Sequence, residues 1–331
     1  MFRFLTAVAV LATTCINLHT SAARAADLQV VVTIKPIHAL ATAVMRGAGE
    51  PKLLIDGAGS PHTFTLKPSD AKALNAANVF LRVSEGLEPF TGRLVKSLPP
   101  AVRVVTLVAT PGLTLHALRT GDNFDDHAHE AAAAKGGHSH GHQQHRPAPK
   151  QAGAATATQN DGHIWLDPAN AKLIATAIAE ALAVAAPDQA VRFKANAVEL
   201  GQQLDKLDAE LGEALKPVAG KPYIVFHDAY QYLERRYGLT PVGSVTVSPD
   251  VPPSAKRLTE LRRKVAGLKA ACVFAEPQFQ PRIIDTIVEG TTARRGTLDP
   301  LGAAIPAGAD QYVSLMRAMA ADLKACLANP A

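Results

Sequence analysis

The sequence contains no cluster of basic residues interleaved with aromatic ones, and this lack argues against nucleic acid as a partner. After residue 25, no apolar run reaches the ~20 residues that a membrane-spanning helix needs. The formal net charge is modest at +5, and it falls to +3 without Arg3 and Arg24. We therefore expect a mature chain without a membrane span that does not bind nucleic acid.

The N-terminal residues predict the compartment. Arg3 precedes an apolar run over residues 4–18, and Ala23-Arg24-Ala25 has the small-x-small pattern of a signal-peptidase site. The tetrapeptide ATTC that ends at Cys15 is a poor lipidation signal. We expect residues 1–25 to be a cleaved signal peptide, which places the mature protein in the periplasm.

Cysteine is scarce, with three residues in the whole chain. Removal of the signal peptide leaves Cys272 and Cys326. An even count in an oxidising compartment favours a disulfide between them. The alternative is a pair of buried free thiols.

Histidine, by contrast, is abundant in one short stretch of low complexity. Six of the twelve histidines lie there, and the segment has no apolar periodicity with which to bury surface. We expect an unstructured loop over about residues 120–159 that binds Zn, Cu or Ni without fixed geometry, unless its histidines are incidental. The six are His127, His129, His138, His140, His142 and His145.

Short β-rich runs alternate with helical stretches along most of the chain, which predicts an α/β fold with parallel sheets covered on both faces. Between Pro168 and about Lys216, helical periodicity replaces the strand signal, and Pro187 separates a first helix from a second of nearly thirty residues. The expected strands are 28–34, 52–55, 79–83, 102–108, 223–226, 242–247, 271–275 and 296–298, and helices are expected to begin near Pro36, Pro68, Glu88 and Asp310.

This pattern divides the chain into two lobes and a helical segment. The signal peptide, residues 1–25, is followed by an N-terminal α/β lobe over residues 26–167 that includes the histidine-rich loop. Residues 168–216 form the helical segment with the linking helix. Residues 217–331 form the C-terminal α/β lobe.

Four polar residues are expected where strands end, and ligands of open parallel sheets bind at the carboxyl ends of the strands. His62 lies in the loop after the second strand, His227 directly ends a strand, and Asp299 ends the last one. His163 stands just before the helical segment, beside the only tryptophan, Trp165. A lone histidine is more often structural than a ligand, but two candidates from each half suit a metal site in a cleft between lobes.

Four segments that contain these residues resemble the zinc-binding proteins of bacterial zinc-uptake ABC transporters. These proteins belong to a cluster of solute receptors for zinc and manganese, cluster A-I or family 9. The similarity runs from the mature start to the C-terminus. The segments are GSPHTFTLKPSD at 59–70, DGHIWLDP at 161–168, FHDAY at 226–230 and GTLDPLG at 296–302.

The resemblance implies that His62, His163 and His227 bind the metal. It also implies two pseudo-symmetric lobes with mainly parallel sheets, joined by a long rigid helix, and a disulfide matching Cys272 and Cys326. The expected function is capture of Zn²⁺ and its delivery to an inner-membrane ABC permease by a monomer that is not an enzyme. The histidine-rich loop would be a weak accessory zinc binder.

The fourth ligand position departs from part of the family. Some zinc members have an acidic residue directly before the first ligand histidine, whereas this chain has Pro61 there. Asp299 matches the position where manganese-type relatives place a carboxylate ligand. We expect Asp299 to bind the metal, with water as the alternative; the purely structural interpretation is that Asp299 caps the following turn.

Ligand chemistry favours zinc over manganese. Manganese prefers oxygen donors, and relatives that bind it tend to have a carboxylate at the position of His227, whereas three imidazoles and one oxygen suit tetrahedral zinc. A manganese receptor or a metal-binding adhesin of the same fold is the alternative. A secreted zinc hydrolase is less favoured, because the chain has no HExxH or HxxEH motif.

Overall fold

The computed structural model describes residues 28–119, 160–246, 249, 253–268, 270–279 and 282–328. The expected signal peptide and the six clustered histidines lie outside the described residues, so both remain predictions.

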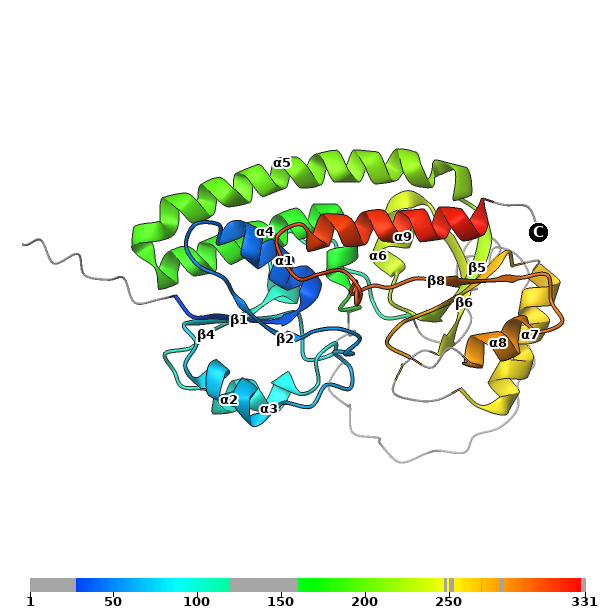
Figure 1. Ribbon diagram of the computed structural model, residues 1–331, viewed down its shortest axis with the longest axis horizontal. Helices are drawn as coiled ribbons and strands as arrows, with labels where there is room; N and C mark the ends of the chain where they lie inside the picture. Colours follow the sequence, from blue (N-terminus) through cyan, green and yellow to red (C-terminus); the bar gives the residue numbers. More distant parts are fainter. Residues whose placement is uncertain are drawn as a thin grey trace, which may run out of the picture.

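Two four-stranded parallel sheets form the centres of two lobes, which confirms the predicted α/β class (Figure 1). The first sheet has the order β2-β1-β3-β4. Its strand β1 reads VVVTI and is buried throughout, as expected for a strand with both faces covered. The strands are β1 (Val30–Ile34), β2 (Lys52–Ile55), β3 (Val79–Arg82) and β4 (Arg103–Thr106), and the lobe's helices are α1 (Lys35–Val44), α2 (Pro68–Asn75) and α3 (Thr91–Ser97).

The second sheet repeats this arrangement with the order β6-β5-β7-β8. A disulfide joins Cys272 at the start of β7 to Cys326 near the end of the last helix, as predicted, and it ties that helix to the sheet. The strands are β5 (Pro222–His227), β6 (Thr240–Thr246), β7 (Cys272–Ala275) and β8 (Arg294–Thr297), and the helices are α6 (Gln231–Tyr237), α7 (Ala255–Leu268), α8 (Arg282–Val288) and α9 (Gln311–Leu327).

Two long helices link the lobes in the sequence. Helix α4 (Pro168–Ala185) ends before Pro187, and a short 3-10 turn leads into α5 (Ala190–Leu215), a helix of 26 residues. At 1.5 Å per residue α5 is roughly 39 Å long. Figure 1 shows it lying across both lobes. It buries one stripe at helical spacing, formed by Phe193, Ala197, Leu200, Leu204, Leu207, Leu211 and Leu215.

Polar contacts attach α5 to both lobes. On the N-terminal side, Asn196 donates a hydrogen bond of 2.9 Å to the carbonyl of Val44 at the end of α1. On the C-terminal side, Arg317 of α9 forms a bidentate ion pair with Glu210 at 2.7 and 2.9 Å. The helix is therefore fixed at both ends, as a rigid connection between lobes requires.

Helix α4 is, by length and composition, the one described helix that could cross a membrane. Half of its apolar window is buried in the protein, where it packs beside α5 and α1. The core helices of globular proteins pass the same test, so α4 is weak evidence for a membrane span.

The structure also differs from the expected elements at Glu88. Helix α3 begins at Thr91, three residues later than predicted. The carboxylate of Glu88 accepts hydrogen bonds from the backbone N–H groups of Val83 and Ser84, at 2.8 and 3.1 Å. Glu88 therefore closes the end of β3 and does not start a helix.

Candidate metal centre

The three histidines predicted as metal ligands come together between the two lobes. One ring nitrogen from each lies within 4.8 Å of the others. The ring centroids are 5.2 to 5.6 Å apart. His62 comes from the loop after β2, His163 directly precedes the 3-10 turn Ile164–Leu166, and His227 is the last residue of β5. The expectation that binding residues follow the carboxyl ends of parallel strands, called the strand-end rule below, thus correctly placed His62 and His227.

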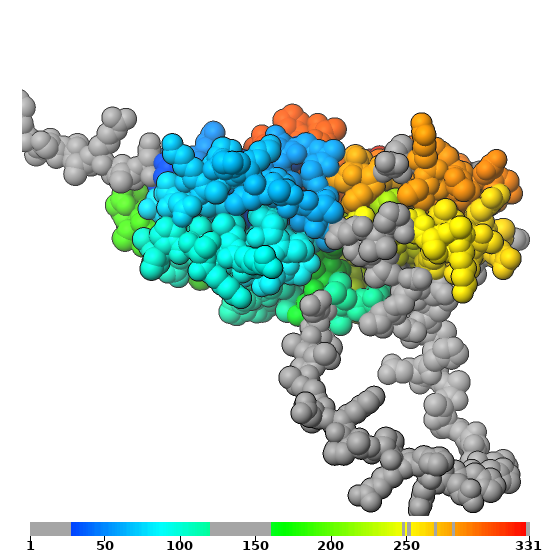
Figure 2. Space-filling view, turned by 90° about the horizontal axis from the view of Figure 1, so that it is seen from below, coloured from blue at the N-terminus to red at the C-terminus, as the bar shows by residue number. Residues whose placement is uncertain are grey.

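The lobes that contribute these residues lie side by side in Figure 2, the first blue to cyan and the second yellow to orange. Between them is a cavity of about 10 Å³. A cavity needs ~10–15 Å³ to hold one water molecule, so this space suits a metal ion with at most a water-sized further ligand and no larger solute. It is lined by Ser60, Pro61, His62, His163, Trp165, His227, Glu276, Gln278, Phe279, Pro300 and Leu301.

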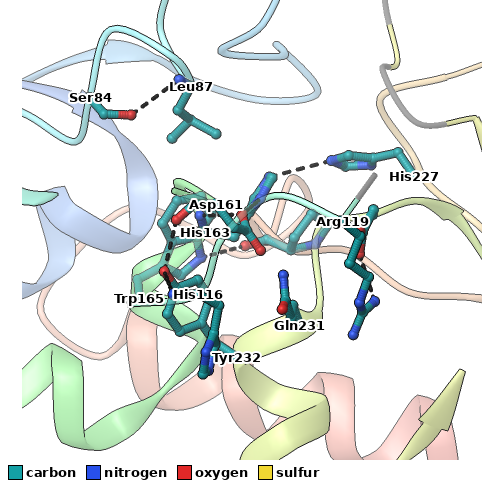
Figure 3. A network of polar contacts seen from close by, with 12 residues as sticks. Ser84, Leu87, His116, Arg119, Asp161, His163, Trp165, His227, Gln231 and Tyr232 are labelled. Carbon is teal, nitrogen blue, oxygen red and sulfur yellow. Dashed lines mark hydrogen bonds and ion pairs between the residues drawn. The ribbon is translucent and has the colours of Figure 1, made fainter. Parts of the chain in front are cut away.

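His163 is held by a buried carboxylate. Its backbone N–H donates to Oδ1 of Asp161 at 3.0 Å, and its Nδ1 lies 2.7 Å from the same oxygen (Figure 3). A carboxylate can only accept, so Nδ1 of a neutral His163 holds the proton and the lone pair is on Nε2. Trp165 is fully buried, and its Nε1 donates a hydrogen bond of 2.9 Å to the carbonyl of Pro300. This bond fixes the 3-10 turn that follows His163 to the C-terminal lobe.

His227 is held in the same way by Glu276, a residue that the sequence reasoning missed. Nδ1 of His227 lies 2.7 Å from Oε1 of Glu276, which is 3% exposed. Glu276 directly follows β7, the neighbour of β5, so the strand-end rule that identified His227 could also have identified Glu276. The Nε2 atoms of His227 and His163 are 3.4 Å apart and face each other (Figure 3).

His62 has no such carboxylate partner. Its backbone N–H donates to Oγ of Ser60 at 3.3 Å, while its Nε2 is buried without a hydrogen-bond partner among the described residues. Burial, with the charges of His163 and His227 as a smaller cause, lowers the pKa of His62 to about 2. His62 therefore presents a neutral imidazole to the cavity across the physiological pH range.

His227 has the opposite tendency. Burial is the largest single influence and acts to lower its pKa, but the charge of Glu276, the hydrogen bond to it and the charges of Asp228 and Asp161 together outweigh burial, so the pKa of His227 is raised. A carboxylate behind a metal-binding imidazole orients the ring and makes it a better donor. Three imidazoles whose ring nitrogens lie this close together form a donor set suited to tetrahedral zinc with one further position.

Asp299 is not part of the histidine group that the structure brings together. Its Oδ1 accepts from the N–H groups of Leu301 and Gly302, both at 3.0 Å, and its Oδ2 accepts from Ala303 at 2.5 Å. These contacts match the structural interpretation, in which Asp299 caps the turn that follows it. Its role as the fourth ligand stays a prediction.

The two other acidic residues beside the candidate ligands also have structural partners. Asp167 caps α4 by accepting from Ala169 at 2.8 Å. Asp228 forms an ion pair of 2.8 Å with Arg119. These contacts give both carboxylates structural roles, one as a helix cap and one in an ion pair.

Comparison with known proteins finds similar sequences over most of the chain. The family model ZnuA, described as zinc-uptake complex component A, periplasmic, matches residues 30–326. The high-affinity zinc uptake system protein ZnuA of Brucella suis biovar 1 (strain 1330) is 43% identical over 306 residues, covering 91% of this chain and 92% of that protein. The protein of the same name from Yersinia pestis is 35% identical, with the same two shares.

Solved structures share the fold. A crystal structure of ZnuA has a TM-score of 0.71 at 24% identity and covers 91% of this chain and 99% of its own. The laminin-binding protein Lmb of Streptococcus agalactiae, described as bifunctional with adhesin and metal-transporting activity, has a TM-score of 0.71 at 26% identity. That match covers 91% of this chain and all of the other.

Proposed function

Because this chain belongs to the ZnuA family of periplasmic zinc-uptake components, we propose that it captures Zn²⁺ at His62, His163 and His227 and delivers the ion to an ABC-type permease of the inner membrane. The main support is the convergence of three imidazole nitrogens from both lobes on one small cavity. Zinc is here the transported substrate.

The donor set supports zinc rather than manganese. Imidazole nitrogens suit zinc and copper, whereas manganese prefers oxygen donors and a higher coordination number. Changing His227 to Glu is expected to shift the preference toward manganese, since a carboxylate would replace one nitrogen. Selectivity against copper, which binds such donors more tightly, comes from cavity geometry or metal availability.

The family is periplasmic, and we propose that residues 1–25 are the signal peptide that is cleaved on export. The mature protein acts as a monomeric receptor without enzymatic activity, and nucleic acid is not a partner. A laminin-binding role of the kind described for Lmb is less favoured, because relatives 43% identical to this chain are zinc-uptake proteins.

The histidine-rich segment is proposed as a weak accessory zinc binder. The residues that flank it pair with each other: Ala117 and Asn160 form an antiparallel bridge, and the N–H of Asp161 donates to the carbonyl of His116 at 2.8 Å. Deletion of residues 126–146 should therefore leave the cleft intact. The expected result is one tight zinc site and the loss of several weak ones; loss of the tight site would refute this division.

The decisive experiment is metal analysis by mass spectrometry of the untagged protein, combined with zinc titrations of variants. We expect one tightly bound zinc per chain, and loss of tight binding in His163→Ala and His227→Ala. His38→Gln is the matched control, since His38 is a buried histidine outside the cavity whose Nε2 lies 2.9 Å from the carbonyl of Pro51. Tight zinc binding that survives the first two changes would refute the proposed site.

A further inference from the structure

One polar group in the cavity has an unused hydrogen-bonding atom. Gln278, three residues after β7, lines the same cavity as the three histidines. Its Nε2 donates a 2.8 Å hydrogen bond to Oδ1 of Asp299. Its Oε1 is buried and has no hydrogen-bond partner among the described residues.

The orientation of this amide follows from chemistry. A carboxylate oxygen can only accept, so the NH₂ group of Gln278 has to face Asp299 and the carbonyl oxygen has to face away. Asp299 is itself held by the three backbone N–H groups of residues 301–303. A buried acceptor without a partner costs about 1–3 kcal/mol, so a fixed, unused oxygen at a binding site calls for a donor.

Asp299 is poorly placed to be the fourth ligand itself. Its two oxygens already accept four hydrogen bonds, from Gln278 and from the backbone of Leu301, Gly302 and Ala303. Asp299 is also not among the residues that line the cavity, whereas Pro300 and Leu301 of the same loop are. Water is then the oxygen ligand that remains, and a zinc-bound water donates hydrogen bonds and needs an acceptor.

Glu276 also has an unused oxygen at the cavity, Oε2. Its other oxygen, however, lies at Nδ1 of His227, on the side of the ring away from the inward Nε2. Glu276 is thus behind the imidazole, and Gln278 is the better acceptor for a group bound to the three imidazoles.

We propose that Oε1 of Gln278 accepts a hydrogen bond from the water molecule that completes zinc coordination. Gln278 is then a positioning residue for the fourth ligand, and Asp299 orients the side-chain amide of Gln278. This inference rests on the proposed zinc site at the three histidines.

The test compares Gln278→Met with Gln231→Met. Gln231 is a matched control, because it is 1% exposed, donates from Nε2 to the carbonyl of Ala117 at 3.1 Å, also has a buried unpartnered Oε1, and does not line the cavity. Zinc affinity is measured by competition with a chelator, and the visible spectra of the Co²⁺-loaded proteins are recorded.

We expect Gln278→Met to lower zinc affinity about 10- to 100-fold, as loss of an outer hydrogen bond to a metal ligand does. Gln278→Met should also change the visible spectrum of the Co²⁺-loaded protein, because the surroundings of the water ligand change. Gln231→Met should leave these readouts unchanged. An unaltered Co²⁺ spectrum and zinc affinity in Gln278→Met would overturn the inference.

One further measurement keeps the result interpretable. His163→Ala in the same assay tests the proposed site separately. Loss of tight binding there with no effect of Gln278→Met would refute only the role of Gln278.

Discussion

The Nζ atom of Lys35 lies 2.9 Å from the carbonyl oxygen of Ala303. Lys35 begins α1 in the N-terminal lobe, whereas Ala303 belongs to the loop after β8 in the C-terminal lobe. The same ammonium group also donates to the carbonyls of Ile305 and Gly302, at 3.0 and 3.3 Å, and lies 3.0 Å from Oδ1 of Asp56. With 5% of its surface exposed, Lys35 is a buried cationic link between the lobes.

Replacement of Lys35 by Met should destabilise the metal-free protein by about 3 kcal/mol, because it leaves buried carbonyl groups without a donor. The measurement is urea-induced unfolding. Lys216→Met is the control, since the Lys216 side chain is 68% exposed and pairs with Glu213 on the surface, where such pairs contribute ~0–1 kcal/mol. Equal losses in the two variants would show that Lys35 is not a significant link.

The interaction of Lys35 with the loop after β8 also illustrates what the sequence could not reveal. His62 and His227 were predictable because the carboxyl ends of parallel strands share one edge of a sheet. The three carbonyl partners of Lys35, by contrast, lie 267 to 270 residues away and are backbone atoms, which leave no trace in side-chain patterns.

The same limit applies to Gln278, whose importance depends on how Asp299 orients it. Asp299 was expected to end the last strand directly and lies two residues after β8, but its hydrogen bonds to the next residues decide what its carboxylate can do. Local sequence can place a residue near the end of a strand. Which neighbours then hydrogen-bond to its side chain depends on packing, and these hydrogen bonds decide the role of the side chain.

Loss of the Cys272–Cys326 disulfide should lower the free energy of unfolding by roughly 4 kcal/mol on the chain-entropy estimate, since the bridge spans 54 residues. The comparison is between the metal-free wild type and a Cys272→Ser, Cys326→Ser double variant in urea. Reductant should destabilise the wild type to the level of the double variant and leave that variant unchanged. Two equally stable proteins under oxidising conditions would contradict the prediction.

Glu88 should make the stability of the metal-free protein fall as pH rises. Burial raises the pKa of Glu88 to about 7 although two backbone N–H groups hydrogen-bond to its carboxylate. Relative to an unfolded pKa of 4.5, the folded state holds the proton more tightly, so this contribution is full below pH 4.5 and is lost as pH rises through about 7.

Glu88→Gln removes this titration and keeps an acceptor oxygen. Its stability relative to wild type should therefore increase by up to about 3 kcal/mol between pH 5 and about pH 9. Unfolding free energies at several pH values give the difference, with Glu85→Gln as an exposed control. A difference that does not change with pH would contradict a raised pKa of Glu88.

Zinc affinity should fall as pH drops through the raised pKa of His227, because zinc binds the neutral imidazole and has to displace its proton. For each proton that zinc has to displace, the affinity falls up to tenfold for every unit by which the pH drops. His62, with its pKa lowered to about 2, stays neutral and adds nothing to this slope near neutral pH. Chelator-competition titrations between about pH 5.5 and 8 measure the effect.

Glu276→Gln identifies the source of that slope. The amide has no charge to favour the imidazolium form, so the pKa of His227 should drop and the loss of zinc affinity should begin at a lower pH than in wild type. At the alkaline end the variant should bind zinc more weakly, because a neutral amide makes the ring a poorer donor. An affinity that is constant from about pH 7.5 to 5.5 in wild type would exclude histidine ligation, whereas identical pH profiles in both proteins would assign the proton to a group other than His227.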